Sequence, residues 1–234
     1  MKKVFVLLCL VSIAWISACS TTEPAKPTGG GGESTAKKKG PSDEQVAAVK
    51  EEYMSGKRNA ASNVPLPGSC TVGQVWEVKF TKDGKEVTET LQVAHRIGRN
   101  LVVEHMTADG VVVAYEIDRN RSAEQGNVKR AWVGKKGWDP YEIKTASGWA
   151  LPDAGTLTQG WTAEPFADVE VAGKKWSGTC YGKGDSKIWV AERGYFNGII
   201  KATGSEGEWM LVKADFKEKP KVYLTNWEFV KPAA

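Results

Sequence analysis

Two histidines, His95 and His105, are the only imidazole groups in the 234 residues, so they are the first candidates for metal or proton chemistry. They fall on neighbouring predicted strands joined near Gly98, and Glu104 is adjacent to the second histidine. A metal centre generally needs three or four ligands and a second layer of hydrogen bonds that orients them. Two histidines on strands of unknown register do not supply this, and we predict neither a metal site nor an acid–base role.

Sequence signatures of catalysis are also missing. The chain contains no G-x-S-x-G, H-E-x-x-H, P-loop or C-x-x-C pattern. Ser34-Thr35-Ala36-Lys37 matches the S-x-x-K pattern of penicillin-binding proteins, but it lies in a stretch too low in complexity to hold a nucleophile against a base. Acidic pairs such as Asp215 and Glu218 depend on a separation in space that a sequence does not show. We therefore expect no catalytic residues, no cofactor and no enzymatic activity.

Cys19 follows a segment typical of an export signal. Lys2 and Lys3 precede the apolar run 4–16, which has the length of a signal-peptide core and is too short for a membrane span of about 20 residues. Ile16-Ser17-Ala18 before Cys19 resembles the lipobox of bacterial lipoproteins. The resemblance implies cleavage after Ala18, diacylglycerol on the Cys19 sulfur and a long-lived membrane anchor. An ordinary secretory signal cut nearby is the alternative.

The same resemblance bears on location. Ser20, in place of an aspartate after the lipidated cysteine, implies sorting to the outer membrane facing the periplasm in a cell with two membranes. In a cell with one membrane, the anchor would lie on the outer face of the cytoplasmic membrane. Removal of residues 1–18 also lowers the formal charge from +4 to +2, so the charge does not indicate nucleic acid as a partner.

Three segments follow the signal. Residues 19–41 combine Pro, Gly, Ser, Thr and Lys without apolar periodicity and predict a disordered tether of on the order of 25 Å. Ser42 and Gln45 form a capping box that predicts a short amphipathic helix over 42–57, with Val46, Val49 and Tyr53 on its apolar stripe. Residues 70–231 are expected to form a single β domain.

Alternating patterns in 70–231 predict about ten antiparallel strands. Trp76, Val78 and Phe80 alternate with polar residues, Asp83-Gly84 suits a tight turn, and Phe80 should then face Val87 while Trp76 faces Leu91. Further predicted strands are 101–106, 111–117, 128–133, 166–171, 175–181, 187–191, 198–202, 209–216 and 221–229. Residues 137–162 carry three Gly-Trp pairs and predict a short helix or lid-like loop. Because long helical patterns are missing, we predict a mainly β fold, either a curved antiparallel sheet or an open barrel.

Two short passages add a resemblance. Residues 167–202 resemble a passage of bacterial exported proteins with LolA/LolB-like curved sheets, and Val72-Gly73-Gln74-Val75-Trp76-Glu77 resembles their first strand. The resemblance implies an envelope setting and this architecture, and it carries no catalytic residue to this chain. In an oxidising envelope, Cys70 and Cys180 are expected to form a disulfide worth about 4.7 kcal/mol on the chain-entropy model. The alternative is two unpaired thiols buried as small apolar residues.

The tryptophans are the candidate ligand residues. Aromatic rings that alternate on strands either fill the core or line an apolar binding surface, and the candidates on strands are Trp76, Phe80, Trp176 and Trp189. Rings on the Gly-Trp loop, which are Trp138, Trp149 and Trp161, could instead stack on sugars or contact a protein. Our leading hypothesis is non-catalytic binding of a lipid or acyl chain on the concave sheet face. The alternatives are an interaction module for envelope protein or polysaccharide, and a structural lipoprotein without ligand.

Overall fold

The computed structural model describes residues 42–54, 60–66, 70–82, 84–194, 196–205 and 207–230. Residues 42–234 belong to one compact unit. The predictions for the signal peptide, for Cys19 and for the tether lie outside the described residues. Among the residues that are described, none of the helices has the length and apolar character needed to cross a membrane.

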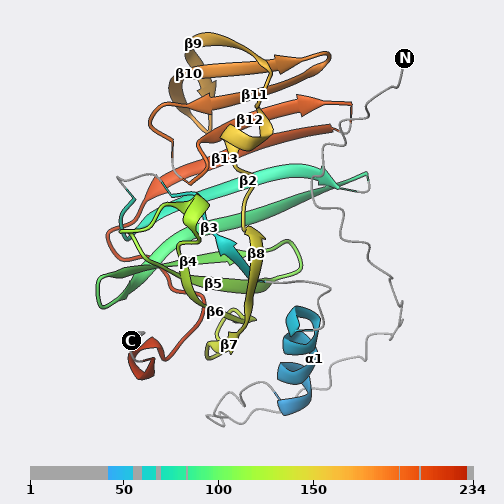
Figure 1. Cartoon of the computed structure of the whole chain (residues 1–234). Helices are drawn as coiled ribbons and strands as arrows, with labels where there is room; N and C mark the ends of the chain where they lie inside the picture. Colours follow the sequence, from blue (N-terminus) through green and yellow to red (C-terminus); the bar gives the residue numbers. More distant parts are fainter. Residues whose placement is uncertain are drawn as a thin grey trace, which may run out of the picture. The chain divides into compact units, whose positions relative to one another are not determined.

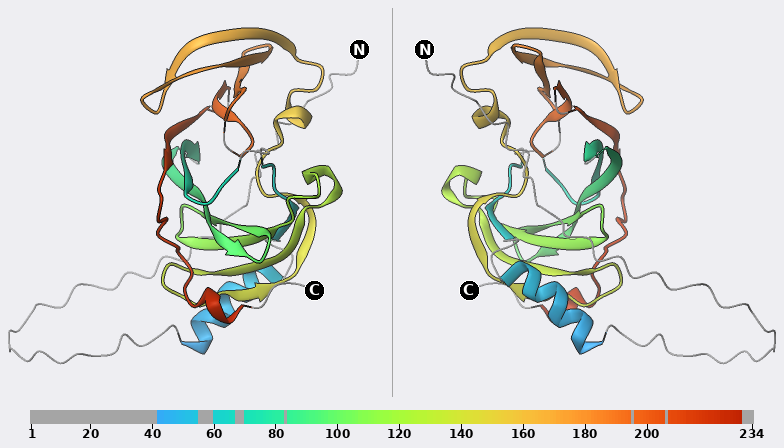
Figure 2. Two further views of the ribbon diagram at one scale, coloured as in Figure 1. Left: turned by 90° about the vertical axis from the view of Figure 1, so that its left-hand side faces the viewer. Right: turned by 90° about the vertical axis from the view of Figure 1, so that its right-hand side faces the viewer.

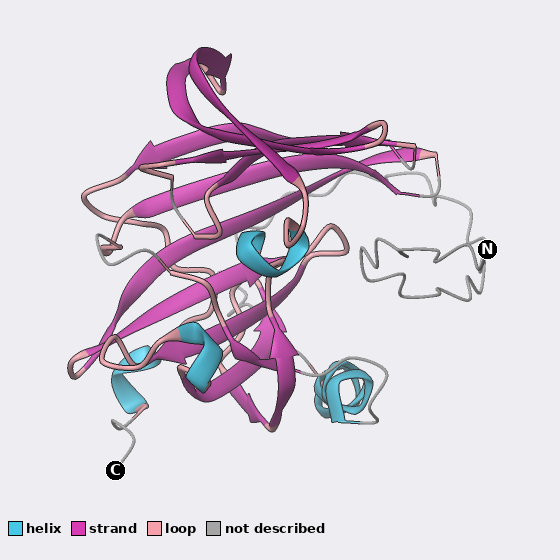
Figure 3. Ribbon diagram, turned by 45° about the horizontal axis from the view of Figure 1, so that its top comes forward, coloured by secondary structure: helices cyan, strands magenta, loops and turns pink. Residues whose placement is uncertain are grey.

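An open, strongly curved antiparallel sheet of eleven strands dominates the structure, as predicted (Figures 1 and 2). Its strand order is β7-β6-β5-β4-β3-β2-β13-β12-β11-β10-β9, so β7 and β9 are its two edges. Figure 3 shows how little helix accompanies these strands. The strands are β2 (Gln74–Lys82), β3 (Lys85–Ile97), β4 (Asn100–Met106), β5 (Val111–Ile117), β6 (Val128–Lys135), β7 (Tyr141–Ile143), β9 (Thr162–Val171), β10 (Lys174–Lys183), β11 (Ser186–Ala191), β12 (Ile199–Gly204) and β13 (Gly207–Phe216).

The β2–β3 hairpin has the register that its alternating pattern predicts. Phe80 pairs with Val87 and Trp76 with Leu91. Gly84 has a φ of 71°, which a residue without Cβ adopts at little cost. Since directly paired residues share a face of an antiparallel sheet, the apolar members of both strands lie on one side.

That side, which we call the inner face, carries most of the core. It bears Trp76, Val78, Leu91, Val93 and Val103, all buried in one cluster. The opposite side, the outer face, bears a smaller cluster that includes Val102, Val112, Ala114, Trp132 and Leu224. Because residues alternate between the faces, a shift of one position anywhere in a strand would exchange the two sets.

Helix α1 (Asp43–Met54) begins at the predicted capping box. The backbone N–H of Gln45 donates to Ser42 Oγ at 3.3 Å, and the N–H of Ser42 donates to Gln45 Oε1 at 3.2 Å. Val46, Val49 and Tyr53 are buried, and the helix packs against β6 and β7. The predicted apolar stripe is therefore the docking face of the helix.

Two regions differ from the sequence-based expectation. Strand β1 (Ala60–Asn63) precedes residue 70 and pairs in parallel with β8 (Thr145–Trp149), which lies in the Gly-Trp segment together with β7 and the short helix α2 (Ala154–Leu157). The expectation of a strand over 221–229 is wrong. This segment has no strand and ends in the 3-10 turn η2 (Trp227–Phe229), because the backbone N–H groups of Tyr223 and Leu224 donate to the Glu104 side chain of the outer face instead of to a neighbouring strand.

Candidate functional site

A continuous row of apolar side chains crosses the inner face of the sheet. Direct pairing connects neighbouring strands from β3 through β2, β13, β12, β11 and β10 to β9. Six steps of about 4.8 Å between strands give the row a length of roughly 29 Å. The members of this inner row are, in order, Val87, Phe80, Trp209, Ala202, Ile188, Tyr181 and Ala163.

The inner row marks the place where the inner face becomes accessible. Phe80, Trp209 and Tyr181 are half-buried, whereas Val78 and Leu211, one position deeper on the same face, are buried. Five of its seven members are half-buried, Ile188 is buried and Ala163 is exposed, and none of them carries a charge, so the row forms a mostly apolar strip of surface. It is the feature of the inner face best suited to hold an apolar ligand.

Deeper on the inner face, aromatic rings fill the space. Trp76 is 1% exposed and makes edge contacts with Trp176 and with Phe196, at ring centroid distances of 6.1 and 6.3 Å. Trp176 is half-buried, and its Nε1 donates to the Val171 carbonyl at 2.8 Å. Of the ligand residues expected on strands, the structure thus brings Trp76 and Trp176 together as packing partners and leaves Phe80 on the accessible row.

Trp189 lies on the other side of the sheet. It pairs with Cys180 and with Lys201, while its neighbour Ile188 pairs with the members of the inner row. The Lys201 ammonium lies 5.6 Å from the centroid of the Trp189 ring. By its strand pairing, Trp189 therefore lies on the face opposite Ile188, which is the outer face, and its ring also packs against the main core cluster.

The three loop tryptophans belong to three different elements. Trp138 lies in the turn between β6 and β7, Trp149 ends β8, and Trp161 lies between α2 and β9. All three are half-buried. Trp138 packs against both core clusters, and the shared Gly-Trp pattern does not bring the three rings into one element.

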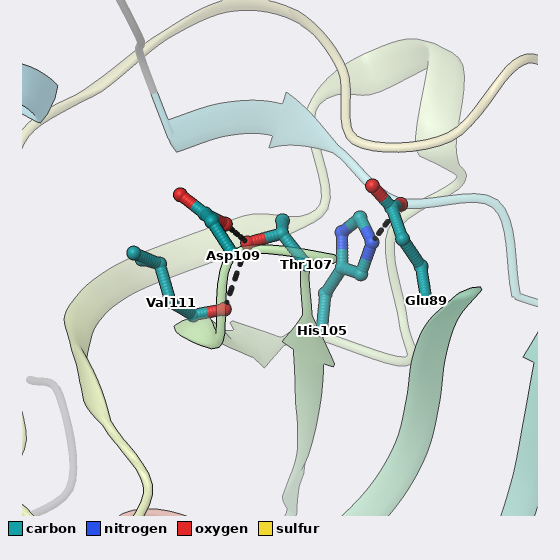
Figure 4. Close-up of polar contacts among 5 residues, drawn as sticks. All are labelled: Glu89, His105, Thr107, Asp109 and Val111. Atoms are coloured by element: carbon teal, nitrogen blue, oxygen red, sulfur yellow. Dashed lines mark hydrogen bonds and ion pairs between the residues drawn. The ribbon is translucent and has the colours of Figure 1, made fainter. Parts of the chain in front are cut away.

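A pair of polar side chains lies next to the β3 end of the apolar inner row. His105 Nε2 lies 2.8 Å from Glu89 Oε2, and these side chains are 12% and 23% exposed (Figure 4). Glu89 is two residues from Val87 on the same face of β3, which is about 7 Å along the strand. Next to the pair, Thr107 Oγ1 lies within hydrogen-bond distance of the Asp109 carboxylate and of the Val111 carbonyl, the latter at 3.0 Å.

The two histidines lie on opposite faces, although they are on paired strands. His105 pairs with Leu91 on the inner face, and Val103 pairs with Val93. A bulge then shifts the register by one residue, so that His95 pairs with Val102 on the outer face. Such an extra residue bends a strand and re-aims the side chains beyond it. The pair at the row was missed from the sequence because Glu89 and His105 meet diagonally across this hairpin.

The outer face carries a second polar group, which the sequence offered only as a neighbour of His105. Glu104 is fully buried and accepts hydrogen bonds from the backbone N–H of Tyr223 (2.8 Å), the N–H of Leu224 (2.9 Å) and Gln92 Nε2 (2.7 Å). Burial raises the pKa of Glu104, and these three donors oppose the shift. Glu104 thereby fastens the segment 221–230 to the sheet.

Cys70 and Cys180 are both free in the structure. Cys70 is buried in a cleft of about 410 Å³ between the β5–β6 loop and the connector before β2, and burial raises the pKa of its thiol to about 12. Cys180 is half-buried on β10 and pairs with Trp189 and Glu164. The predicted disulfide is not present in this structure.

Comparisons with known proteins add little. No family model and no curated protein matches the chain. Among solved structures, it resembles MucB in complex with MucA(peri), with a TM-score of 0.37 and 11% identity over 63% of this chain and 51% of that one. It also resembles MucB alone, with a TM-score of 0.36 and 10% identity over 75% of this chain and 58% of that one. The matches thus span little more than half of the MucB chains, and similarity at this level assigns neither a family nor a function.

Proposed function

We propose that this protein is a non-catalytic binding protein of the bacterial cell envelope that holds an acyl chain on the inner row. The observation that carries the proposal is the row itself, which crosses seven strands with mostly half-buried side chains and without a charged member. Each methylene that an acyl chain buries there contributes about 0.8 kcal/mol. A row of roughly 29 Å has room for a chain of ordinary length lying across the strands.

An acyl chain suits this surface better than a peptide does. The inner row runs across the strands, and the strands from β3 to β10 are already hydrogen-bonded to a neighbour on each side. A peptide lying on the row would lose water from its N–H and C=O groups and find no backbone partner, at a cost of about 1–3 kcal/mol per group. An acyl chain carries no such groups along its length.

The free edge of β9 does not offer the peptide a better place. Pro165 lies within the strand, Asp168 has a φ of 55°, and the register shifts between Trp176 and Gly178 on the partner strand. Proline, a bulge and charged residues are the features that protect an edge strand from pairing with another chain. This edge therefore argues against β-strand addition.

The place of the protein in the cell is part of the same proposal. The lipobox-like Ile16-Ser17-Ala18 before Cys19 supports attachment to a membrane through Cys19, and Ser20 supports the outer membrane of a diderm cell. Anchoring through Cys19 would keep the domain close to membrane lipids. These lipids would supply acyl chains to the inner row.

The test compares two tryptophans on opposite faces. The chain is expressed with Cys19→Ala, and binding of dodecanol is measured by displacement of the neutral dye N-phenylnaphthylamine. Trp209→Asp should weaken binding at least tenfold, because Trp209 is an interior member of the row, between Phe80 and Ala202. Trp189→Asp, at an equally half-buried tryptophan of the outer face, should leave binding within twofold. Equal loss in both variants, or no binding by the parent protein, would refute the proposal.

A further inference from the structure

The β3 end of the inner row meets a largely buried polar pair, and the β9 end meets none among the described residues. At the β3 end, Glu89 and His105 lie on the inner face and are largely buried, as Figure 4 shows for their contact. At the β9 end, the row finishes at the exposed Ala163. If the protein recognises the polar end of a bound amphiphile, this end therefore lies beside Glu89.

The charge of this pair is negative or zero in either protonation state of the histidine. If His105 carries a proton, its charge balances the Glu89 carboxylate, and if it is neutral the pair has a charge of −1. Asp109 lies exposed at the neighbouring turn, where water and salt screen its charge. A carboxylate or phosphate placed here would meet like charge in a partly desolvated position, where repulsion is stronger than in water.

The pair also has a free acceptor. Oε2 of Glu89 contacts His105, and among the described residues the structure gives no partner to Oε1. A carboxylate oxygen is an acceptor only, and a hydrogen bond to a charged acceptor is about twice as strong as one between neutral groups. Glu89 is thus suited to receive an N–H or O–H group of a ligand.

Cationic side chains near the row lie at its other margin. Lys85 on β3 and Lys183 on β10 have the same alternation as Val87 and Tyr181, but both are exposed at the tips of hairpins. Lys85 is four residues from Glu89, about 13 Å along the strand. Exposed lysines attract an anion weakly because water and salt screen them.

We infer that the hydrocarbon chain of the ligand on the inner row ends in a hydrogen-bond donor without negative charge, as in a long-chain amine, alcohol or amide. Glu89 accepts the hydrogen bond from this group. The inference rests on the proposed function and narrows its ligand class. A free fatty acid is the amphiphile that it excludes as the preferred ligand. Glu89 then acts as the specificity-determining residue, and the apolar row supplies the affinity common to all chains.

The experiment compares three ligands that have the same twelve-carbon chain, which are dodecylamine, dodecanol and dodecanoate. Their binding is measured by displacement of N-phenylnaphthylamine from the protein carrying Cys19→Ala. We expect dodecylamine to bind at least tenfold more tightly than dodecanoate at neutral pH, with dodecanol between them. In Glu89→Gln, which keeps the size of the side chain, the ratio should fall to within threefold. The matched control is Glu77→Gln, on the outer face of β2, which should keep the parent's ratio.

The outcomes separate the two proposals. If the parent protein binds none of the three ligands, the row is not an acyl site and both proposals fall. If it binds dodecanoate as tightly as dodecylamine, or more tightly, the role of Glu89 is refuted while acyl binding stands, and Lys85 and Lys183 become the candidates for the headgroup. Retention of the amine preference in Glu89→Gln likewise refutes the assignment.

Discussion

Replacement of Glu104 by leucine is predicted to detach the C-terminal segment from the outer face. The change removes the acceptor of three buried donors, which are the backbone N–H groups of Tyr223 and Leu224 and the amide of Gln92. Leaving a buried donor unpaired costs about 1–3 kcal/mol, so the three together cost roughly 3 kcal/mol at the lower limit. Part of this loss is offset, because burial raises the pKa of Glu104 and the variant no longer buries a charge.

We therefore expect a net loss of roughly 2–3 kcal/mol in the free energy of unfolding at neutral pH. With a urea m-value of about 2 kcal/mol/M, the unfolding midpoint falls by about 1 M. The loss should be concentrated at the C-terminal segment. Leu224 is fully buried there, and its Cδ2 lies so close to Gly134 that a Cβ on this glycine would be 2.8 Å away. The Leu224 side chain therefore packs tightly against β6, and this packing depends on the backbone hydrogen bonds to Glu104.

Hydrogen exchange at single amides tests this reasoning together with urea unfolding. The amides of Tyr223 and Leu224 should exchange at least tenfold faster in Glu104→Leu than expected from the change in global stability. Glu116→Leu is the matched control, because Glu116 is also fully buried on the outer face but is bonded to Asn100 and Arg130. That variant should lose stability without selective exchange at 223 and 224. Slow exchange of both amides in Glu104→Leu would refute the assigned role of this carboxylate.

Two further predictions concern titratable groups. Burial lowers the pKa of His95 below its ordinary value near 6.5. The contribution of the neutral ring to stability is therefore complete above pH 6.5 and is lost as the pH falls through the folded pKa. His95→Phe should flatten the decline in the urea midpoint below pH 6.5, and an unchanged decline would contradict this. Burial raises the pKa of Cys70 to about 12, so iodoacetamide at pH 8 should modify the half-buried Cys180 before Cys70, as read by peptide mass spectrometry. Resistance of both cysteines until a reductant is added would instead show the disulfide predicted from the sequence.

Local patterns predicted the hairpins because their information is local. The alternation in β2 and β3 and the glycine at position 84 define which residues face each other, and the structure has Phe80 opposite Val87 as expected. The capping box at Ser42 likewise predicts where α1 begins, because both hydrogen bonds join residues three apart. Strands formed in this way, without helices to connect parallel neighbours, lead to the antiparallel curved sheet that was predicted.

The site depends on contacts between distant parts of the chain. The inner row is continuous only because β13 pairs with β2, which places Trp209 beside Phe80 across more than a hundred residues of sequence. The bulge after Val93 moves His95 to the outer face and leaves His105 alone with Glu89 on the inner face. The alternation of apolar and polar residues along a strand predicts neither the pairing of β13 with β2 nor the bulge. It shows which residues share a face but not which face of the sheet that is.

The sequence by itself determined where most strands of the large sheet and their turns fall, since turn residues and two-residue periodicity act over short stretches of chain. It also carries the apolar run and the Ile16-Ser17-Ala18 triplet from which an export signal before Cys19 is predicted. Only the tertiary structure decided which face each aromatic residue occupies, as Trp76 in the core, Phe80 on the row and Trp189 outside show. The physical reason is that the face of a residue depends on pairing and bulges, and these are set by burial summed over the whole sheet.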